Sequence, residues 1–483
     1  MTATRSSSTS TLSTTSTEAK SEELDRQTTD LEKAATNSQI GYPVEPTKST
    51  ASRASNGLQN TLSRTLSRIR TSDTLDPGPP PDQGIAAWSQ ALLGHLVVFN
   101  TWGFINSFGV FQTYYVNTLR IGSPSEVAWI GTIQVFVLFS LGMFAGRLLD
   151  AGFFRITFIV GSVIYLFGMF MLSLCTAYWQ VFLAQGICVG IGFGLVFVPS
   201  LALVSTYFSK HRAIAIGTTA AGSATGGIVF PAIAVAMLPT AGFGWTIRTM
   251  AFVQLLGAVL CAVFLKPRIP PRKAGPVIEW SAFKDMPYML YLTCGFFFFW
   301  SVYIGFYYIG TFARNTLGLS QSDSISLLIA MNGVGLPARL IINYVAGKYT
   351  GPINILLPFI VITGLLAYCW SAVHSVSGLW VFACIYGLSA AALQSLWPVV
   401  LTSLTTDPKK AGVRAGMGFC FVGFAVLTGP PIGGALIERL DGRFLGCQIF
   451  AGSSMIVSAC ILGLTRWAVL RRDGIGWKWK VKV

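Results

Sequence analysis

Long apolar runs recur along the chain from about residue 86 onward, and short polar connections separate them. An α-helix rises 1.5 Å per residue, so about 20 apolar residues are needed to cross the roughly 30 Å hydrocarbon core of a bilayer. The stretches long enough to do so lie at about 86–112, 126–146, 155–175, 178–206, 213–238, 244–265, 287–311, 323–345, 352–371, 377–404, 415–437 and 443–467. The pattern therefore predicts an all-α membrane protein with twelve transmembrane helices.

The longest connection between these stretches, "KPRIPPRKAGPVIEWSAFKDM", is basic, proline-rich and central. It divides the helices into two groups of six. The turns "GRLLDAGFFR" and "NYVAGKYTGP" occupy corresponding places in the two groups, which indicates pseudo-symmetric halves. We expect an N-terminal half at 84–265, a central cytoplasmic loop at 266–286, a C-terminal half at 287–467 and a basic cytoplasmic C-terminal tail at 468–483.

Composition and charge support a membrane protein. Of 483 residues 52% are hydrophobic and only 11% are charged, with a mean hydropathy of +0.60, whereas a soluble domain has about 25% charged residues. The net charge is +15, but the basic residues lie in connections and tails, which argues against a nucleic-acid-binding protein. The even-numbered connections and the C-terminal tail hold most of the Lys and Arg residues, and the odd-numbered ones hold only Arg120, Arg248, Arg314, Arg439 and Arg443. Since basic residues favour the cytoplasmic side, both termini are predicted to be cytoplasmic in a multi-pass protein of the plasma (cell) membrane.

The N-terminal tail, residues 1–83, is rich in Ser, Thr and Pro and has no apolar run. Such a segment cannot bury enough apolar surface to fold, so we expect it to be disordered and cytoplasmic. Within it, "SRTLSRIRTS" places arginines beside serines and threonines, a pattern that a basophilic kinase would recognise. A plain solvated tail explains the same residues.

No catalytic motif is present. The chain has no GxSxG, no Walker A sequence and no HExxH, so neither an enzyme nor an ATP-driven pump is expected, and no cofactor or metal. Carboxylates are also nearly absent from the apolar stretches: Glu126, Asp323 and Glu438 lie at their outer ends. A proton-moving transporter commonly keeps an acid within the membrane, so proton coupling is left open.

One arginine, Arg339, lies inside the apolar stretch "MNGVGLPARLIINYVAG". A cation at membrane depth costs roughly 2.5–3.5 kcal/mol or more. At about 100° per residue, Asn332, Gly335, Arg339 and Asn343 share one helix face, and such a polar stripe normally faces the bundle interior or a water-filled cavity. The alternative is that Arg339 snorkels to the nearby headgroups. We take Arg339, Asn332 and Asn343 as candidate substrate-binding residues.

Other candidates lie on the first, seventh and tenth predicted spans. Aromatic and amide side chains there can stack on, or hydrogen-bond to, a small organic ligand. They are Trp102, Asn106, Tyr303, Tyr307, Gln394 and Trp397. His95 is a candidate for proton coupling, because histidine exchanges protons near neutral pH; a packing histidine is the alternative.

Three further segments indicate close packing and gating. Small residues spaced four apart, as in "YFSKHRAIAIGTTAAGSATGG", allow helix backbones to approach closely. The adjacent prolines of "TGPPIGG" are expected to bend the eleventh span. The candidate gating and motif residues are Gly146, Arg147, Asp150, Arg155, Lys210, Arg212, Gly217, Gly222, Gly226, Pro430 and Pro431.

The same segments resemble a known family. Tyr207-Phe208, Lys210, Arg212-Ala213, Gly217, Ala221-Gly222-Ser223 and Gly226 resemble the fifth-span signature of the monocarboxylate transporters (monocarboxylate porters), a family of the major facilitator superfamily. Asp82, Gly84 and Trp88 are similar to the family's first-span signature, and "FNTWGFINSFGVFQTYY" resembles its fungal branch. The resemblance covers about residues 80–470 and implies two six-helix halves around a central site.

The resemblance also bears on the candidate residues. It places Arg339 at the eighth-span arginine that binds the substrate carboxylate in the family. Gly335 stands where proton-coupled members have an aspartate, and Asn106 where they have a lysine, so the use of protons as a partner stays open. We therefore expect a secondary active or facilitative transporter that moves a small organic molecule, a carboxylate or carboxylate-bearing metabolite, by alternating access. Uptake and efflux of a secondary metabolite both fit, and a non-transporting nutrient sensor that signals through its N-terminal tail is the alternative.

Overall fold

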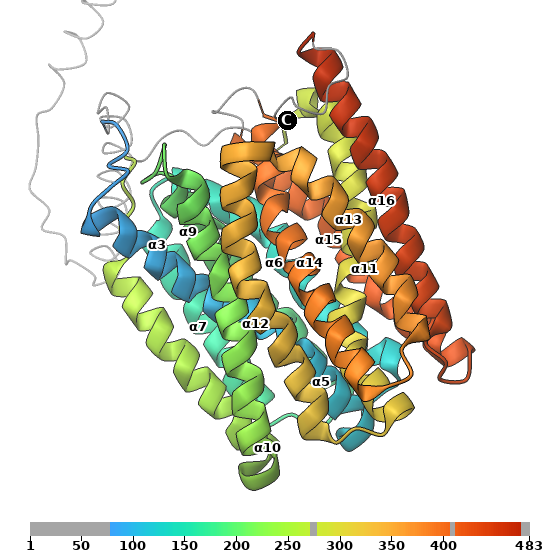
Figure 1. The fold of residues 1–483 in the computed structure, drawn as a ribbon. Helices are drawn as coiled ribbons and strands as arrows, with labels where there is room; N and C mark the ends of the chain where they lie inside the picture. The colour runs from blue at the N-terminus through green and yellow to red at the C-terminus, as the bar shows by residue number, and fades with distance from the viewer. Residues whose placement is uncertain (1–77, 271–277, 406–410, 475–483) are drawn as a thin grey trace, which may run out of the picture. The chain divides into compact units, whose positions relative to one another are not determined.

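A computed structural model describes residues 78–270, 278–405 and 411–474, and every regular element within these ranges is helical. The expectations for residues 1–77, including the kinase motif, and for residues 475–483 fall outside the described residues. The predicted twelve stretches lie largely within the helices (Figure 1).

The first predicted span is divided among five short elements: α3 (Ile85–Val98), η1 (Phe99–Gly103), α4 (Phe104–Asn106), α5 (Phe108–Tyr114) and η2 (Tyr115–Leu119). The next three spans comprise α6 (Pro124–Asp150), α7 (Phe154–Leu172), α8 (Tyr178–Val181), η3 (Phe182–Val189) and α9 (Gly190–Ser205). The fifth and sixth spans together form α10 (Arg212–Phe264). Within α10 the chain turns at Gly242, whose φ of 74° suits a residue without a Cβ atom.

The remaining elements begin with the short η4 (Trp280–Lys284) and α11 (Met286–Leu317). They continue with α12 (Gln321–Val345), η5 (Ala346–Thr350), α13 (Pro352–Cys369), η6 (Trp370–Ala372), α14 (Val376–Ser403), α15 (Ala411–Arg439) and α16 (Leu445–Arg472). Several of these helices start at predictable caps: Ser320 accepts a hydrogen bond from the Asp323 N–H at the start of α12, and Ser375 accepts one from Gly378 at the start of α14.

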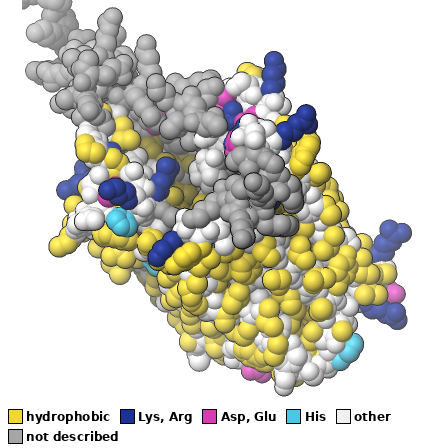
Figure 2. Space-filling view, turned by 45° about the horizontal axis from the view of Figure 1, so that its top comes forward, with side chains coloured by type: hydrophobic (Ala, Val, Ile, Leu, Met, Phe, Trp, Pro, Cys, Tyr) yellow, Lys and Arg dark blue, Asp and Glu magenta, His cyan; other side chains and the backbone are white. Residues whose placement is uncertain are grey.

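Among the described residues, ten helices are long and apolar enough to cross a membrane. The number is below twelve because α10 covers two predicted spans and the first span is broken into short pieces. The prediction of an all-helical membrane fold is confirmed. Figure 2 shows hydrophobic side chains spread over the visible face of the helices, with Lys and Arg side chains gathered near its ends, as expected for a lipid-facing surface.

We name the two ends of the helical bundle the tail face and the far face. The tail face holds residues 78–84, 206–211 and the end of α16, and lies at the top of Figure 1. The far face holds residues 120–123, the turn of α10 at Gly242 and residues 318–320. Between the two faces, α6 packs along α15 and α10 packs along α12, so the first six spans meet the second six along two seams.

The small residues of α10 lie where helices cross most closely. A Cβ atom at Gly226 would lie 2.5 Å from the Phe99 carbonyl oxygen and 2.7 Å from Cα of Gly103, so this contact leaves no room for a side chain. Gly222 makes the same kind of contact with the His95 carbonyl group. The opposite side of α10 faces α12, where Gly227 touches Asn332. The fifth span therefore lies between the first and the eighth.

Candidate functional site

A cavity of about 80 Å³ lies between the two sets of six spans. The first six spans contribute Val98, Trp102, Phe139, Phe197, Leu201, Ile216, Ala220 and Ser223. The second six contribute Phe299, Tyr303, Arg339, Gln394, Ser395, Trp397, Pro398 and Phe419. The walls are mainly aromatic and aliphatic, and the lining includes one ionisable cation and no carboxylate among the described residues.

Arg339 is the charged residue of this cavity. Its side chain is 2% exposed, and its Nη2 donates a hydrogen bond of 3.3 Å to Oε1 of Gln394 on α14. Tyr303 on α11 lies near enough to interact with it electrostatically. Among the described residues no carboxylate forms an ion pair with Arg339. The guanidinium is thus held between α12 and α14 and is directed into the protein, which does not fit the snorkelling alternative.

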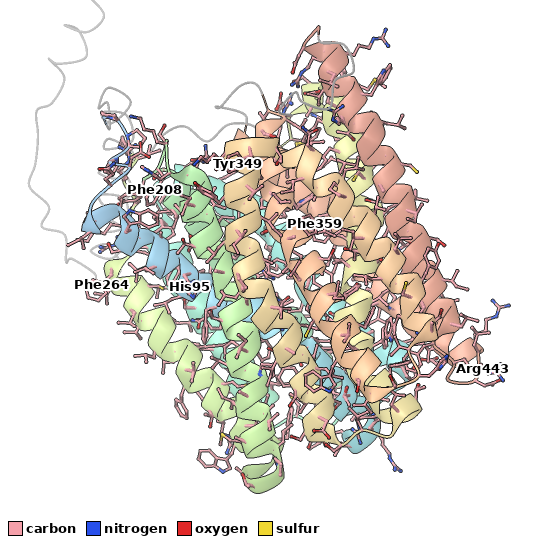
Figure 3. The ribbon with its side chains drawn as sticks, viewed as in Figure 1. His95, Phe208, Phe264, Tyr349, Phe359 and Arg443 are labelled. Carbon is pink, nitrogen blue, oxygen red and sulfur yellow. The ribbon has the colours of Figure 1, made fainter. Side chains whose placement is uncertain are left out.

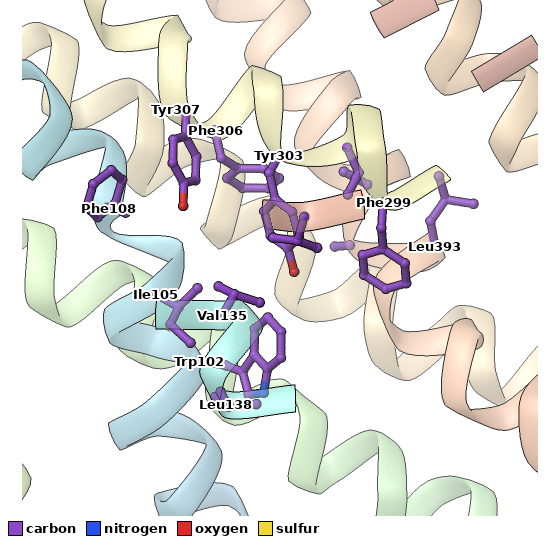
Figure 4. Packing of buried hydrophobic residues seen from close by; sticks show 14 of the residues in the cluster. Trp102, Ile105, Phe108, Val135, Leu138, Phe299, Tyr303, Phe306, Tyr307 and Leu393 are labelled. Atoms are coloured by element: carbon purple, nitrogen blue, oxygen red, sulfur yellow. The ribbon is translucent and has the colours of Figure 1, made fainter. Parts of the chain in front are cut away.

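Aromatic rings from both halves form the walls. Trp102 packs against Phe139 and Phe197 at centroid distances of 5.5 and 5.6 Å. From the other half, the ring of Trp397 stacks on Tyr291 at 4.3 Å. Figure 4 shows Trp102 facing Phe299 and Tyr303 across the space between the halves. The structure therefore brings five of the predicted substrate-binding residues to one cavity: Arg339, Trp102, Tyr303, Gln394 and Trp397.

The two asparagines of α12 do not line this cavity, contrary to expectation. Asn343 donates a hydrogen bond of 2.6 Å to the Arg339 carbonyl oxygen, and Asn332 donates one of 2.9 Å to the Leu328 carbonyl oxygen, each four residues back. The physical reason is that α10 covers their part of the helix face: a Cβ atom at Gly227 would lie 2.5 Å from the Asn332 carboxamide.

Asn106 and Tyr307 also lie outside the cavity lining. Asn106 is buried, and neither polar atom of its side chain has a partner among the described residues. The Tyr307 ring packs on Phe108 at a centroid distance of 4.8 Å (Figure 4). A Cβ atom at Gly131 would lie 2.5 Å from the Tyr307 hydroxyl oxygen, so Tyr307 fills the contact between α11 and α6.

His95 is fixed between α3 and α10 (Figure 3). Its Nδ1 lies 2.9 Å from the Thr218 carbonyl oxygen, and its Nε2 lies 2.9 Å from Oγ1 of Thr225. A carbonyl oxygen only accepts, so Nδ1 donates to Thr218, while Nε2 pairs with the Thr225 hydroxyl, which also bonds to the Gly222 carbonyl oxygen at 3.1 Å. Since His95 is absent from the lining of the central cavity, the geometry fits the packing alternative.

The far face is closed by contacts between the halves. The Ser125 N–H donates to Glu438 at 2.8 Å, and the Ser125 hydroxyl donates to the Pro431 carbonyl oxygen at 3.0 Å. Within the second half the Tyr308 hydroxyl donates to the Pro430 carbonyl oxygen at 2.7 Å, and it reaches the Pro124 carbonyl oxygen of the first half at 3.4 Å. The two prolines singled out in the sequence therefore offer carbonyl groups to α6 and α11 at this seam.

On the tail-face side the cavity continues. A second cavity, of about 270 Å³, shares Leu201, Ile216, Pro398 and Phe419 with the central one. Its lining includes four of the predicted gating and motif residues, Gly146, Arg147, Asp150 and Arg212, and one more arginine, Arg268. Lys210 and Arg155 are exposed and lie outside this lining. Among the described residues, the cavities thus extend from Arg339 toward the tail face, and contacts between the halves lie at the far face.

Several lining residues were not singled out in the sequence. Phe139, Phe197, Phe299 and Phe419 lie among many aromatic residues of the same spans, and periodicity does not tell which apolar face meets a cavity and which meets lipid. Ser223 and Ser395 carry no distinctive signal either, because small polar residues are common where membrane helices pack.

Comparison with known proteins agrees with this architecture. The profile of the Major Facilitator Superfamily matches residues 91–412. An MFS-type transporter of Gibberella zeae is 43% identical over 401 residues, which cover 82% of this chain and 90% of that protein. The aspyridones efflux protein apdF of Emericella nidulans is 35% identical, with coverage of 78% and 77%. The agnestins efflux protein AgnL12 of Paecilomyces divaricatus is 32% identical, with coverage of 82% and 92%.

Proposed function

Because the chain belongs to the Major Facilitator Superfamily, we propose that it exports an organic anion of moderate size by alternating access. The chain is a membrane transporter and not an enzyme. The observation that carries the proposal is Arg339, which is buried in the wall of the central cavity without a carboxylate partner among the described residues. A buried charge without a counter-charge is costly, and an anionic substrate would supply that counter-charge.

The chemistry of arginine favours an oxyanion. Its guanidinium group is a planar fork of donors that matches a carboxylate in a bidentate manner, and charge-assisted hydrogen bonds are roughly twice as strong as neutral ones. The resemblance to the fungal monocarboxylate porters supports the same substrate class. The aromatic side chains of the cavity wall, among them Trp102, Phe299 and Tyr303, can stack on a ring, which favours a ring-bearing metabolite over a short aliphatic acid.

The lining charges and the named relatives support export. The excess of Lys and Arg favours a cytoplasmic location for the tail face, toward which the cavity continues. Arg147, Arg212 and Arg268 line the second cavity, which has one carboxylate, Asp150, among its described residues. A cavity with an excess of positive charge raises the local concentration of anions. The relatives named above include efflux proteins for aspyridones and agnestins, so a secondary metabolite is the proposed substrate. The relatives are named transporters, which gives the sensor alternative no support.

We further propose that export needs no proton taken up by a carboxylate of the cavity. The lining contains none among the described residues, and both ring nitrogens of His95 are engaged elsewhere. An anion leaving a cell with a negative interior gains roughly 2.3 kcal/mol per charge for each 100 mV. The membrane potential is therefore a sufficient driving force.

The test uses purified protein in proteoliposomes loaded with an aromatic carboxylate. We expect efflux that a diffusion potential, negative inside, accelerates. Arg339→Gln should lower the flux by about tenfold or more, since a hydrogen bond to a charged group contributes roughly 1.5–3 kcal/mol. The flux of Arg339→Lys should lie between those of the wild type and Arg339→Gln, because lysine keeps the charge but lacks the planar array of donors. The matched control is Arg443→Gln, at an exposed arginine outside both cavities, with wild-type flux. Wild-type kinetics for both Arg339 variants at equal protein would refute the proposal.

The orientation has its own test. An epitope tag at residue 1 should survive protease added to sealed right-side-out cells, because the charge distribution predicts cytoplasmic termini. Cleavage of the tag would show that residue 1 lies outside the cell. The proposed orientation and direction of transport would then be wrong.

A further inference from the structure

Several side chains that line the central cavity carry hydrogen-bond donors without a partner among the described residues. Nε1 of Trp102 and Nε1 of Trp397 are buried and have no hydrogen-bond partner among the described residues. The two side chains are 9% and 1% exposed. An indole N–H can only donate, and a buried donor without a partner is costly. Two rigid donors, one from each half of the protein, thus lack an acceptor.

A third free donor follows from the pairing of Arg339. A guanidinium has donors and no acceptor, so the amide of Gln394 must present its oxygen to Arg339. Its nitrogen, Nε2, is therefore turned away from the guanidinium, and it is buried without a partner among the described residues. The Arg339 guanidinium therefore determines which way the Gln394 amide group is turned.

The two serine hydroxyl groups of the lining add no free donor. The Ser395 hydroxyl donates to the Ala392 carbonyl oxygen at 3.0 Å, and the Ser223 hydroxyl donates to the Ala220 carbonyl oxygen at 2.7 Å. Their protons are used within their own helices, and no carboxylate lines the cavity among the described residues. The serine oxygens can still accept a hydrogen bond, but no charged acceptor lines the cavity among the described residues, whereas three N–H donors lack a partner.

From this imbalance we propose that the substrate is a conjugated ring acid that carries ring oxygen acceptors, such as keto groups, in addition to its anionic group, and that Trp102, Gln394 and Trp397 select for those oxygens. The inference rests on the proposed function, since Arg339 binds the anionic group. The flat aromatic walls suit a conjugated ring, while the indole and amide N–H groups meet its oxygens. A site that must hydrogen-bond a substrate discriminates strongly against an analogue that lacks the partner group, because its buried donors are then left unpaired.

The experiment compares two acids of the same charge and ring framework on the purified full-length protein. Anthraquinone-2-carboxylate carries two ring carbonyl oxygens, and anthracene-2-carboxylate carries none. Binding is measured by calorimetry in detergent. We expect the quinone acid to bind about tenfold more tightly. Trp397→Phe, which keeps a ring to stack on Tyr291, and Gln394→Leu should each bring the ratio of the two affinities close to one. Trp179→Phe, at an exposed tryptophan outside the cavity, is the matched control and should keep the wild-type ratio.

The outcomes separate the two proposals. Arg339→Gln should weaken both acids, while the quinone acid keeps an advantage from the two indole N–H groups, which do not depend on Arg339. Equal affinity of the two acids for the wild type, with loss of both in Arg339→Gln, would overturn this inference and leave the proposed function standing. Binding of neither acid would overturn it as well. Binding of both acids without any dependence on Arg339 would instead remove the basis of the proposed function.

Discussion

Gly335 lies one helical turn before Arg339 on α12, and a Cβ atom at Gly335 would lie 2.9 Å from Nη1 of Arg339. The same Cβ atom would lie 2.9 Å from Cβ of Ala391 on α14. The guanidinium therefore occupies space that the glycine leaves open. In the family that the sequence resembles, an aspartate stands at this place in proton-coupled members, so this position decides whether the arginine has a fixed counter-charge.

The first prediction is that Gly335→Asp makes transport depend on protons. An ionised carboxylate at this position would pair with Arg339, because an opposite charge nearby favours the ionised form, and would compete with the substrate. We expect anion flux in proteoliposomes to fall about tenfold at pH 7.5 and to rise as the pH is lowered, because the anion displaces the carboxylate from Arg339 and a proton must then bind to that carboxylate. The wild type should follow only the ionisation of the substrate.

Gly335→Ala is the control for crowding. It adds the same Cβ atom, which would press on Arg339 and Ala391, but it adds no charge. Its flux should be lowered equally at both pH values. If Gly335→Asp and Gly335→Ala show the same pH profile, the carboxylate has no effect on coupling and the prediction is wrong.

The helices were predictable from sequence because few backbone conformations are stable inside a membrane. Backbone groups have no water to bond within lipid, so each apolar stretch must satisfy them internally as a helix. The ends were less certain: α11 continues to Leu317 and α16 to Arg472, each beyond the apolar pattern, because helices extend into the polar region once water can solvate their ends.

Which face of a helix meets the cavity was only partly predictable. Periodicity placed Arg339 and the two asparagines on one face of α12, but α10 covers the asparagines and leaves the arginine facing α14. In the first span, Trp102 and Asn106 are four residues apart, yet only Trp102 lines the cavity. Trp102 lies in η1, a π-helical segment, where i→i+5 hydrogen bonds shift the register of the following residues. That irregularity leaves no signal in the hydrophobic pattern.

The second prediction concerns the close crossing of Gly226 and Gly103. A methyl group at Gly226 would meet the backbone of Phe99 and Gly103, which cannot rotate away. Gly226→Ala should therefore destabilise the protein by about 1–3 kcal/mol, as overpacking does, and lower its apparent melting temperature in detergent. Gly333→Ala is the matched control: it lies within α12 with nothing within 4 Å of the added atom, so its melting temperature should not fall. Equal losses in both variants would contradict the packing argument.

The third prediction concerns the closed far face. The Glu438 carboxylate accepts a hydrogen bond from the Ser125 N–H at the N-terminus of α6, where the helix dipole favours a negative charge. Glu438→Gln keeps an acceptor and removes the charge. We expect the conformational equilibrium to shift by about 0.3–1 kcal/mol toward the state open at the far face.

Distances between spin labels at Thr118 and Asn315, in a background without native cysteines, would report that shift as a larger population of long distances. The control is Glu126→Gln, at the carboxylate that accepts from the Ser123 N–H within the cap of α6 and does not join the two halves. An unchanged distance distribution in Glu438→Gln would show that the apolar contacts, and not this bond, hold the face closed.

The last prediction concerns Asp82, which fixes the chain before α3 to the loop before α10. Its N–H donates to the Tyr207 carbonyl oxygen at 3.1 Å, and its Oδ1 accepts from the Ser209 N–H at 2.6 Å and the His211 N–H at 3.3 Å. Its φ of 52° is left-handed, a conformation that Asp and Asn tolerate better than most residues. Partial burial acts to raise the pKa of Asp82, but the backbone N–H groups outweigh it and hold the pKa below the ordinary value of 3.8.

The sign of the pKa shift sets the pH range of this contact. A carboxyl group whose pKa is lowered in the folded state stabilises it above the unfolded pKa, and the contribution disappears as the pH falls through the folded pKa. The contact should thus be complete throughout pH 5–8. Asp82→Ala removes both the acceptor and the tolerance for left-handed backbone, so the amides of Ser209 and His211 should exchange hydrogen about tenfold faster at any pH in this range. Asp82→Asn keeps one acceptor oxygen and the backbone preference, and should give intermediate protection. Wild-type exchange at both amides in Asp82→Ala would show that the loop is held by Tyr207 and its neighbours without the carboxylate.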